Sequence, residues 1–183
     1  MQTWVIASKK KCLRGLEVEP GTRLKPVKEF RTYKRNLPHF EQTGSVYFIT
    51  FKTTEGFTLS DAAKDITFAS IKFHEGKKYR LYACVVMETH VHSILQPLEE
   101  SKGSFHSIAQ IMHSIKSYSA NRIQRLLNKK GNVWLDENYD RIIRDDEEYL
   151  EKLNYVVNNP LQGGVVDKPE DYRWLFIEGS GSK

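Results

Sequence analysis

The 183-residue sequence has only two cysteines and no hydrophobic run long enough to cross a membrane. Cys12 and Cys84 cannot build a disulfide framework or a zinc-type cysteine set, so we expect two unpaired thiols. The first residues have no charged lead and no long apolar centre, which argues against a signal peptide. We therefore expect a cytoplasmic protein with a single main domain.

Familiar catalytic signatures are also absent. The sequence has no glycine-rich phosphate loop, no Ser-His-Asp spacing and no His-Glu-x-x-His helix. What it does have is a modest basic excess, with a net charge of +5 and a pI of about 9.1. Much of this excess lies between residues 9 and 35, where it is either a solvated arm or a contact to a DNA backbone.

Hydrophobic periodicity predicts alternating strands and helices. We expect strands at residues 45–53, 79–88 and 90–96, a fourth strand within residues 133–143, and helices at residues 61–74, 105–130 and 145–158. Ser60 is expected to cap the first helix, Gly131 to end the second and Pro160 to cut the third. The order β-α-β-β-α-β-α predicts an α+β fold of the ferredoxin-like (RRM-like) class: an antiparallel sheet backed by helices, with an additional C-terminal helix.

Three regions follow from this pattern. Residues 1–38 form a basic, largely irregular N-terminal arm that is interrupted by prolines, and residues 39–175 form the domain. Residues 176–183 form a flexible tail rich in glycine and serine.

The most informative motif is His90-Val91-His92, at the start of a predicted strand. Because side chains alternate along a strand, His90 and His92 point to the same face. Two imidazoles on one face can hold a metal ion or a phosphate. An incidental structural pair is the alternative, and the motif alone leaves both open.

A second motif is Tyr155-Val156-Val157-Asn158-Asn159-Pro160. Tyr155 and Asn159 are four residues apart, so they share one face of the last helix. A phenol can be a nucleophile and an amide oxygen can complete the coordination of a metal ion. Alternatively, Tyr155 packs in the core and Asn159 caps the helix end.

The segment from Trp134 to Arg144 mixes aromatic residues with arginines. This composition suits base stacking and phosphate contacts, and it equally suits an edge strand with surface charges. Candidate DNA-binding residues here and elsewhere are Arg141, Arg144, Lys116, Arg122, Arg35 and Trp134.

Taken in order, these motifs resemble the REP-associated tyrosine transposases, a branch of the single-tyrosine HUH transposases. The resemblance runs from about residue 36 to residue 174, and it is most specific at residues 86–92, 139–144 and 155–160. It implies that His90 and His92 bind a metal ion, that Tyr155 is the nucleophile and that Asn159 completes the metal site. Thr89 departs from the pattern, because relatives usually carry Asn, Asp or Glu before the first histidine.

The resemblance further implies a metal-dependent transposase that cleaves and rejoins single-stranded DNA beside a hairpin, through a 5′-phosphotyrosine. The cofactor would be Mg²⁺ or Mn²⁺, and the protein would act as a monomer or a homodimer. Two alternatives remain: a catalytically silent protein that binds DNA or RNA hairpins, and a phosphoesterase that uses water and forms no adduct.

Overall fold

The computed structural model describes residues 30–34 and 38–179. Within these ranges, none of the helices has the length and apolar character that crossing a bilayer would require. The elements in chain order are β1 (Phe30–Lys34), β2 (Pro38–Gln42), β3 (Tyr47–Lys52), α2 (Asp61–Phe73), β4 (Tyr79–Val86), β5 (His90–Pro97), β6 (Glu99–Ser101), β7 (Ser104–Phe105), α3 (Ile108–Leu127), β8 (Tyr139–Ile142), α4 (Asp146–Gln162), the 3-10 helix η1 (Pro169–Asp171) and β9 (Leu175–Ile177).

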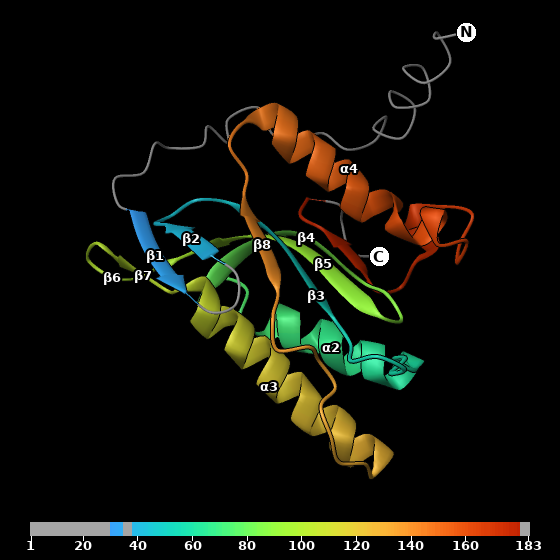
Figure 1. The fold of residues 1–183 in the computed structure, drawn as a ribbon. Coiled ribbons are helices and arrows are strands. Elements are labelled where there is room, and N and C mark those ends of the chain that lie inside the picture. The colour runs from blue at the N-terminus through green and yellow to red at the C-terminus, as the bar shows by residue number, and fades with distance from the viewer. Residues whose placement is uncertain (1–29, 35–37, 180–183) are drawn as a thin grey trace, which may run out of the picture.

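A five-stranded antiparallel sheet in the order β8-β3-β5-β4-β9 organises the molecule. Helix α4 covers one face of this sheet, and α2 and α3 cover the other (Figure 1). From β3 to α4 the sheet strands and helices follow the predicted order, so the antiparallel α+β fold with its additional C-terminal helix is confirmed. That helix carries Tyr155.

Each long helix begins at a side-chain cap. Ser60 accepts a hydrogen bond from the amide of Ala63, as predicted, and Asp145 accepts one from the amide of Glu148. Ser107 forms a capping box with Gln110. These caps satisfy amides that have no partner within the helix, which fixes where α2, α3 and α4 start.

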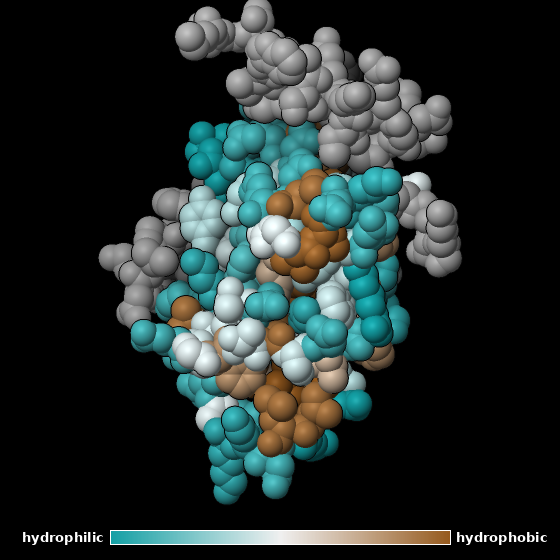
Figure 2. All heavy atoms as spheres, turned by 90° about the vertical axis from the view of Figure 1, so that its right-hand side faces the viewer, coloured by the Kyte–Doolittle hydropathy of each residue, from teal (hydrophilic) through white to brown (hydrophobic). Residues whose placement is uncertain are grey.

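The core lies mainly between the sheet and the pair α2 and α3. Ile49, Phe51 and Leu95 alternate with site-facing residues of β3 and β5 and are fully buried. Cys84 is a buried free thiol, as expected, whereas Cys12 lies outside the described residues. The side on which α4 ends is mostly hydrophilic, with apolar side chains gathered in separate patches (Figure 2).

Two predicted helix ends are wrong. Helix α3 ends before Gly131, because Asn128 adopts the left-handed conformation (φ 48°) and its amide bonds back to Arg125. Helix α4 continues through Pro160 to Gln162. A proline removes one amide donor, but the last turn is closed by the amides of Gly163 and Val165, which donate to Asn159 and Pro160.

Strand lengths also differ from the prediction. Between residues 133 and 143, only β8 is a strand, and Trp134 forms an isolated bridge to Thr53. The loop expected at residues 99–103 is part of the small β6–β7 hairpin. These segments carry more polar residues than the central strands, which blurs the alternation on which strand prediction depends.

Both predicted end regions contribute strands. Residues 30–34, expected to be irregular, pair with residues 38–42 as the β1–β2 hairpin. Residues 176 and 177, expected in the tail, belong to β9, which pairs with β4. Such edge pairings depend on which neighbouring strand is exposed, and this cannot be deduced from one short segment.

Candidate active site

Strand β5 places the two histidines on the face of the sheet beneath α4. His90 and His92 lie opposite Lys52 and Thr50 of β3, and the centroids of the two imidazole rings are 4.8 Å apart. His92 is buried, while His90 is half-buried. A hydrogen-bonded strand in mid-sheet therefore holds both rings with little backbone freedom.

Helix α4 brings the other two predicted residues to the same place. The Oδ1 atom of Asn159 lies 3.1 Å from Nε2 of His90, and the Tyr155 ring meets the His92 ring edge-on at 4.9 Å. Tyr155 is 42% exposed, so it is not a core residue, and Asn159 lies inside the helix rather than capping it. All four predicted side chains converge within one chain.

His90, His92 and Tyr155 line an open cavity of about 520 Å³, and Asn159 reaches it through its contact with His90. Aromatic, hydroxyl and cationic side chains line it: Phe48, Thr50, Lys52, His90, His92, Tyr139, Lys152 and Tyr155. Its two lysines give the cavity a positive character that suits an anionic ligand such as a phosphodiester.

Sequence reasoning did not identify the other five lining residues, among them Thr50, Lys52 and Lys152. Thr50 and Lys52 alternate along the strand that pairs with β5, so their role depends on that pairing. Lys152 precedes Tyr155 by three residues, and this spacing could have identified it, because such positions share a helix face.

Burial lowers the pKa of both imidazoles. The pKa of His92 falls to about 3, because burial penalises the charged ring and because His90 and Lys52 add repulsion. The pKa of His90 is also lowered, chiefly by burial, although its hydrogen bond to Asn159 opposes that shift. Both rings are therefore neutral at pH 7, the form in which histidine binds metal ions.

The donor atoms fit a divalent cation. Nε2 of His92 is buried and has no hydrogen-bond partner in the described part of the chain. Nε2 of His90 must carry the proton in its bond to Asn159, because an amide oxygen only accepts. A cation between these atoms would replace that proton and supply the partner that His92 lacks. Imidazole nitrogens with an amide oxygen suit Mn²⁺, Mg²⁺ or Zn²⁺ to different degrees.

Asn159 places an amide oxygen beside His90. Across the described ranges, no cluster of three or more His, Cys, Asp or Glu side chains is placed to hold a metal ion.

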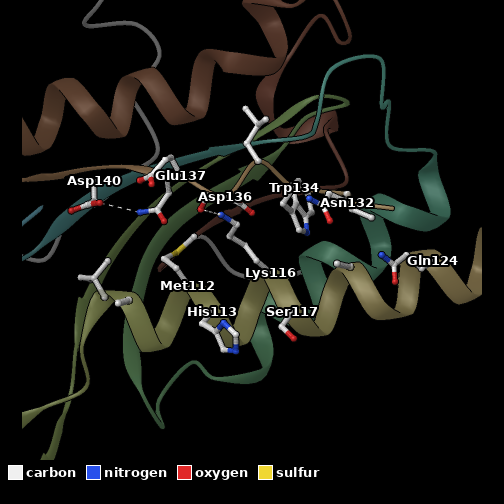
Figure 3. A pocket seen from close by; sticks show the side chains of 16 residues that line it. Met112, His113, Lys116, Ser117, Gln124, Asn132, Trp134, Asp136, Glu137 and Asp140 are labelled. Carbon is white, nitrogen blue, oxygen red and sulfur yellow. Dashed lines mark hydrogen bonds between the residues drawn. The ribbon is translucent and has the colours of Figure 1, made fainter. Parts of the chain in front are cut away.

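A larger cavity of about 630 Å³ lies elsewhere, between α3 and the segment of residues 132–140 (Figure 3). Lys116 reaches across it and donates a hydrogen bond to the carbonyl of Asp136 at 2.7 Å. The side-chain amide of Asn138 donates to the carboxylate of Asp140 at 3.0 Å. This cavity contains none of the four convergent residues.

The proposed stacking role of Trp134 is wrong. Its side chain is buried, with Nε1 donating to Ser119 at 2.9 Å and its ring meeting Phe51 edge-on at 4.9 Å. A ring enclosed in this way cannot stack on a base. Trp134 is a core residue that ties the segment after α3 to that helix.

The other candidate DNA-binding residues lie at different places. Arg141 pairs with Glu148 at 2.5 Å and has an exposed side chain. It lies opposite Phe48 in the sheet register, on the face of the histidines, and Arg144 is exposed close by in the chain. Lys116 and Arg122 belong to α3, across the sheet from the site. Arg35 lies outside the described residues.

Comparisons with known proteins test the family resemblance and the fold. No family model matches the chain. A protein of Haemophilus influenzae named as a candidate REP-associated tyrosine transposase is 22% identical over 140 residues, which cover 70% of this chain and 77% of that protein. A second protein of the same organism, without a functional name, is 26% identical over 99 residues, covering 45% of this chain and 54% of its own length.

A solved structure of a REP-associated tyrosine transposase bound to a REP hairpin has the same fold. It aligns with a TM-score of 0.60 and 19% identity over 81% of each chain. The resemblance that the motifs predict is therefore confirmed, in sequence by the Haemophilus influenzae relative and in fold by the solved structure.

Proposed function

We propose that this relative of the REP-associated tyrosine transposases cleaves and rejoins single-stranded DNA, with Tyr155 as the nucleophile. The observation that carries the proposal is the convergence of Tyr155, His90 and His92 on one open cavity, with Asn159 in contact with His90. A purely structural role would not require an exposed phenol beside two neutral imidazoles, one of them buried.

His90, His92 and Asn159 would hold a divalent cation, Mg²⁺ or Mn²⁺. When bound, such an ion neutralises the negative charge of a phosphodiester and polarises it toward attack. The neutral state of both imidazoles at pH 7 means that binding requires no loss of charge from the rings.

Tyr155 carries out the covalent step in this proposal. Its phenol oxygen attacks the scissile phosphorus, and the bond to the 3′ oxygen of the preceding nucleotide breaks. The phenol proton is balanced by the proton that the leaving oxygen gains, which yields a 5′-phosphotyrosine and a free 3′-hydroxyl. Because one phosphoester bond forms for each one broken, a second 3′-hydroxyl can reverse the step without ATP.

The cavity supports a single strand as the substrate. Lys52 and Lys152 provide positive charge, and Tyr139 presents a ring that is 53% exposed at the cavity wall. Open aromatic faces beside cations are suited to unpaired bases and their phosphates. The solved relative is bound to a REP hairpin, so we propose a hairpin with a single-stranded flank as the ligand of this chain.

One protomer holds the whole set of residues. Asn159 and Tyr155 contact His90 and His92 of the same chain. We therefore propose that a monomer suffices for cleavage, with no exchange of α4 between subunits.

The test is covalent capture of DNA. Protein is incubated with an end-labelled hairpin that has a single-stranded flank, in the presence of Mn²⁺, and the products are separated on a denaturing gel. We expect an adduct with the wild-type chain and none with Tyr155→Phe, while hairpin binding in a gel-shift assay is retained. Tyr139→Phe is the matched control, because Tyr139 lines the same cavity and should still allow the adduct.

Other outcomes would identify a different function. Hairpin binding with neither adduct nor cleavage in any variant would indicate a silent binding protein. Cleavage without an adduct would indicate a phosphoesterase that uses water. An adduct that persists in Tyr155→Phe and disappears in Tyr139→Phe would assign the nucleophile to Tyr139.

A further inference from the structure

We propose that Thr50 is a positioning residue that holds His92 in the tautomer whose Nε2 lone pair faces the cation site. The hydroxyl of Thr89 makes a similar but longer contact with His90. This inference rests on the metal site of the proposed function and adds a role for the hydroxyl groups behind it.

Both imidazoles meet a threonine hydroxyl at Nδ1. Oγ1 of Thr50 lies 2.7 Å from Nδ1 of His92, across the pairing of β3 with β5. Oγ1 of Thr89 lies 3.3 Å from Nδ1 of His90 and is exposed. In each ring, Nδ1 therefore contacts a hydroxyl, and Nε2 lies at the opposite end of the ring.

The two neutral tautomers of His92 differ in what they leave unpaired. If Nε2 carried the proton, a buried N–H would have no acceptor in the described part of the chain. If Nδ1 carries it, that N–H donates to Oγ1 of Thr50 and leaves a lone pair on Nε2. A buried N–H without an acceptor is rare in proteins, so the second tautomer is favoured, and it is the one that binds a cation.

Neighbouring rings keep His92 from rotating. Phe48 stacks on it, with centroids 5.5 Å apart and an interplanar angle of 17°. Tyr155 meets the ring edge-on at 72°. A ring flip would move Nδ1 away from Thr50 and turn Nε2 away from its present position. The aromatic contacts hold the plane of the ring, and the Thr50 hydroxyl at Nδ1 favours the present orientation over the flipped one.

His90 differs because its Nε2 proton is engaged by Asn159. When a cation replaces that proton, the neutral ring must carry its proton on Nδ1. The Thr89 hydroxyl can accept from that position, because a hydroxyl both donates and accepts. Because Thr89 is exposed and its contact is longer, we expect it to contribute less to cation binding than Thr50 does.

Mn²⁺ binding without DNA tests this role apart from catalysis. We expect Thr50→Val to weaken Mn²⁺ binding about tenfold, as is typical when a group that orients a ligand is removed. Thr50→Ser keeps the hydroxyl and should restore most of the affinity, and Thr89→Val should lose less than Thr50→Val. Calorimetric titration measures the affinities, and circular dichroism verifies that each variant is folded.

A second measurement reads the tautomer directly, without metal or DNA. Long-range ¹H–¹⁵N spectra of the metal-free wild-type chain distinguish protonated from bare ring nitrogens, and His92→Gln assigns the signals. We expect His92 to show a protonated Nδ1 and a bare Nε2.

The outcomes separate this inference from the proposed function. If the wild-type chain binds Mn²⁺ and Thr50→Val binds it equally well, the positioning role is wrong while the metal site stands. A protonated Nε2 on His92 would also overturn the positioning role alone. A folded wild-type chain that binds no Mn²⁺ would overturn the metal site and this inference together.

Discussion

Around the candidate site, β3 and β5 present apolar side chains to one face of the sheet and polar ones to the other. Facing α2 and α3, residues such as Ile49, Phe51 and Leu95 are fully buried among apolar neighbours. Facing α4, the alternate residues Thr50 and His92 border an open cavity. A strand sends successive side chains to opposite faces, so β3 and β5 serve packing and chemistry at the same time.

This contrast indicates a division of labour. Apolar burial on the α2 and α3 side stabilises the strands, and the strands hold the histidines in place on the other side. The α4 side costs some folding free energy, because Nε2 of His92 is buried without a hydrogen-bond partner in the part of the chain that the structure describes. Changes on one face should therefore alter stability, and changes on the other should alter chemistry.

The largest effect on stability is expected from truncation on the packed face. Ile115 of α3 is buried, and Ile115→Ala should lower the free energy of unfolding by about 2–5 kcal/mol through lost contacts and a cavity. Urea denaturation measures the change. The folded fraction should still form the covalent adduct, and loss of the adduct at full folding would break the division between the faces.

Acidification should destabilise the protein through the site face. Unfolded His92 takes up a proton near pH 6.5, whereas the folded ring resists protonation down to about pH 3. The contribution of His92 to the free energy of unfolding is therefore fully present above pH 6.5, and it is lost as the pH falls toward 3. At pH 5 the loss from this group is about 2 kcal/mol, since one pKa unit corresponds to about 1.4 kcal/mol. Denaturation of the wild type and of His92→Gln at pH 7 and at pH 5 measures how much of the loss in stability comes from His92.

The outcome for His92→Gln decides whether burial of this ring is the cause. The variant should lose less stability than the wild type on acidification, because glutamine does not titrate. Equal losses in both proteins would assign the pH dependence to other groups.

A smaller effect is expected at Trp134. Trp134→Phe removes the hydrogen bond from Nε1 to Ser119 and should cost about 1 kcal/mol. Thermal denaturation measures this loss. Hairpin affinity should not change, because the ring is buried on the packed side. A marked fall in affinity at full folding would restore the stacking role that composition suggested.

Much of the architecture was predictable from local patterns. Runs of β-branched, aromatic and apolar residues located β3, β4 and β5, and helical periodicity with Ser60 as a cap located α2. Predictions failed where the sequence pattern was weak, or where later backbone amides replaced the hydrogen bond that a residue removes. Pro160 was expected to cut α4, yet the following amides close the turn around it. Trp134 looked like a stacking residue until its burial was known.

By itself, the sequence determined which residues could act: a His-x-His pair on one strand face, and a tyrosine and an asparagine on one helix face. Those periodicities are local, because they depend only on backbone geometry over a few residues. Only the tertiary structure decided that the two faces meet, that Thr50 stands behind His92 and that Tyr155 opens onto a cavity. Contacts between residues far apart in the chain depend on strand pairing and on how α4 packs against the sheet, and neither is encoded in a short segment.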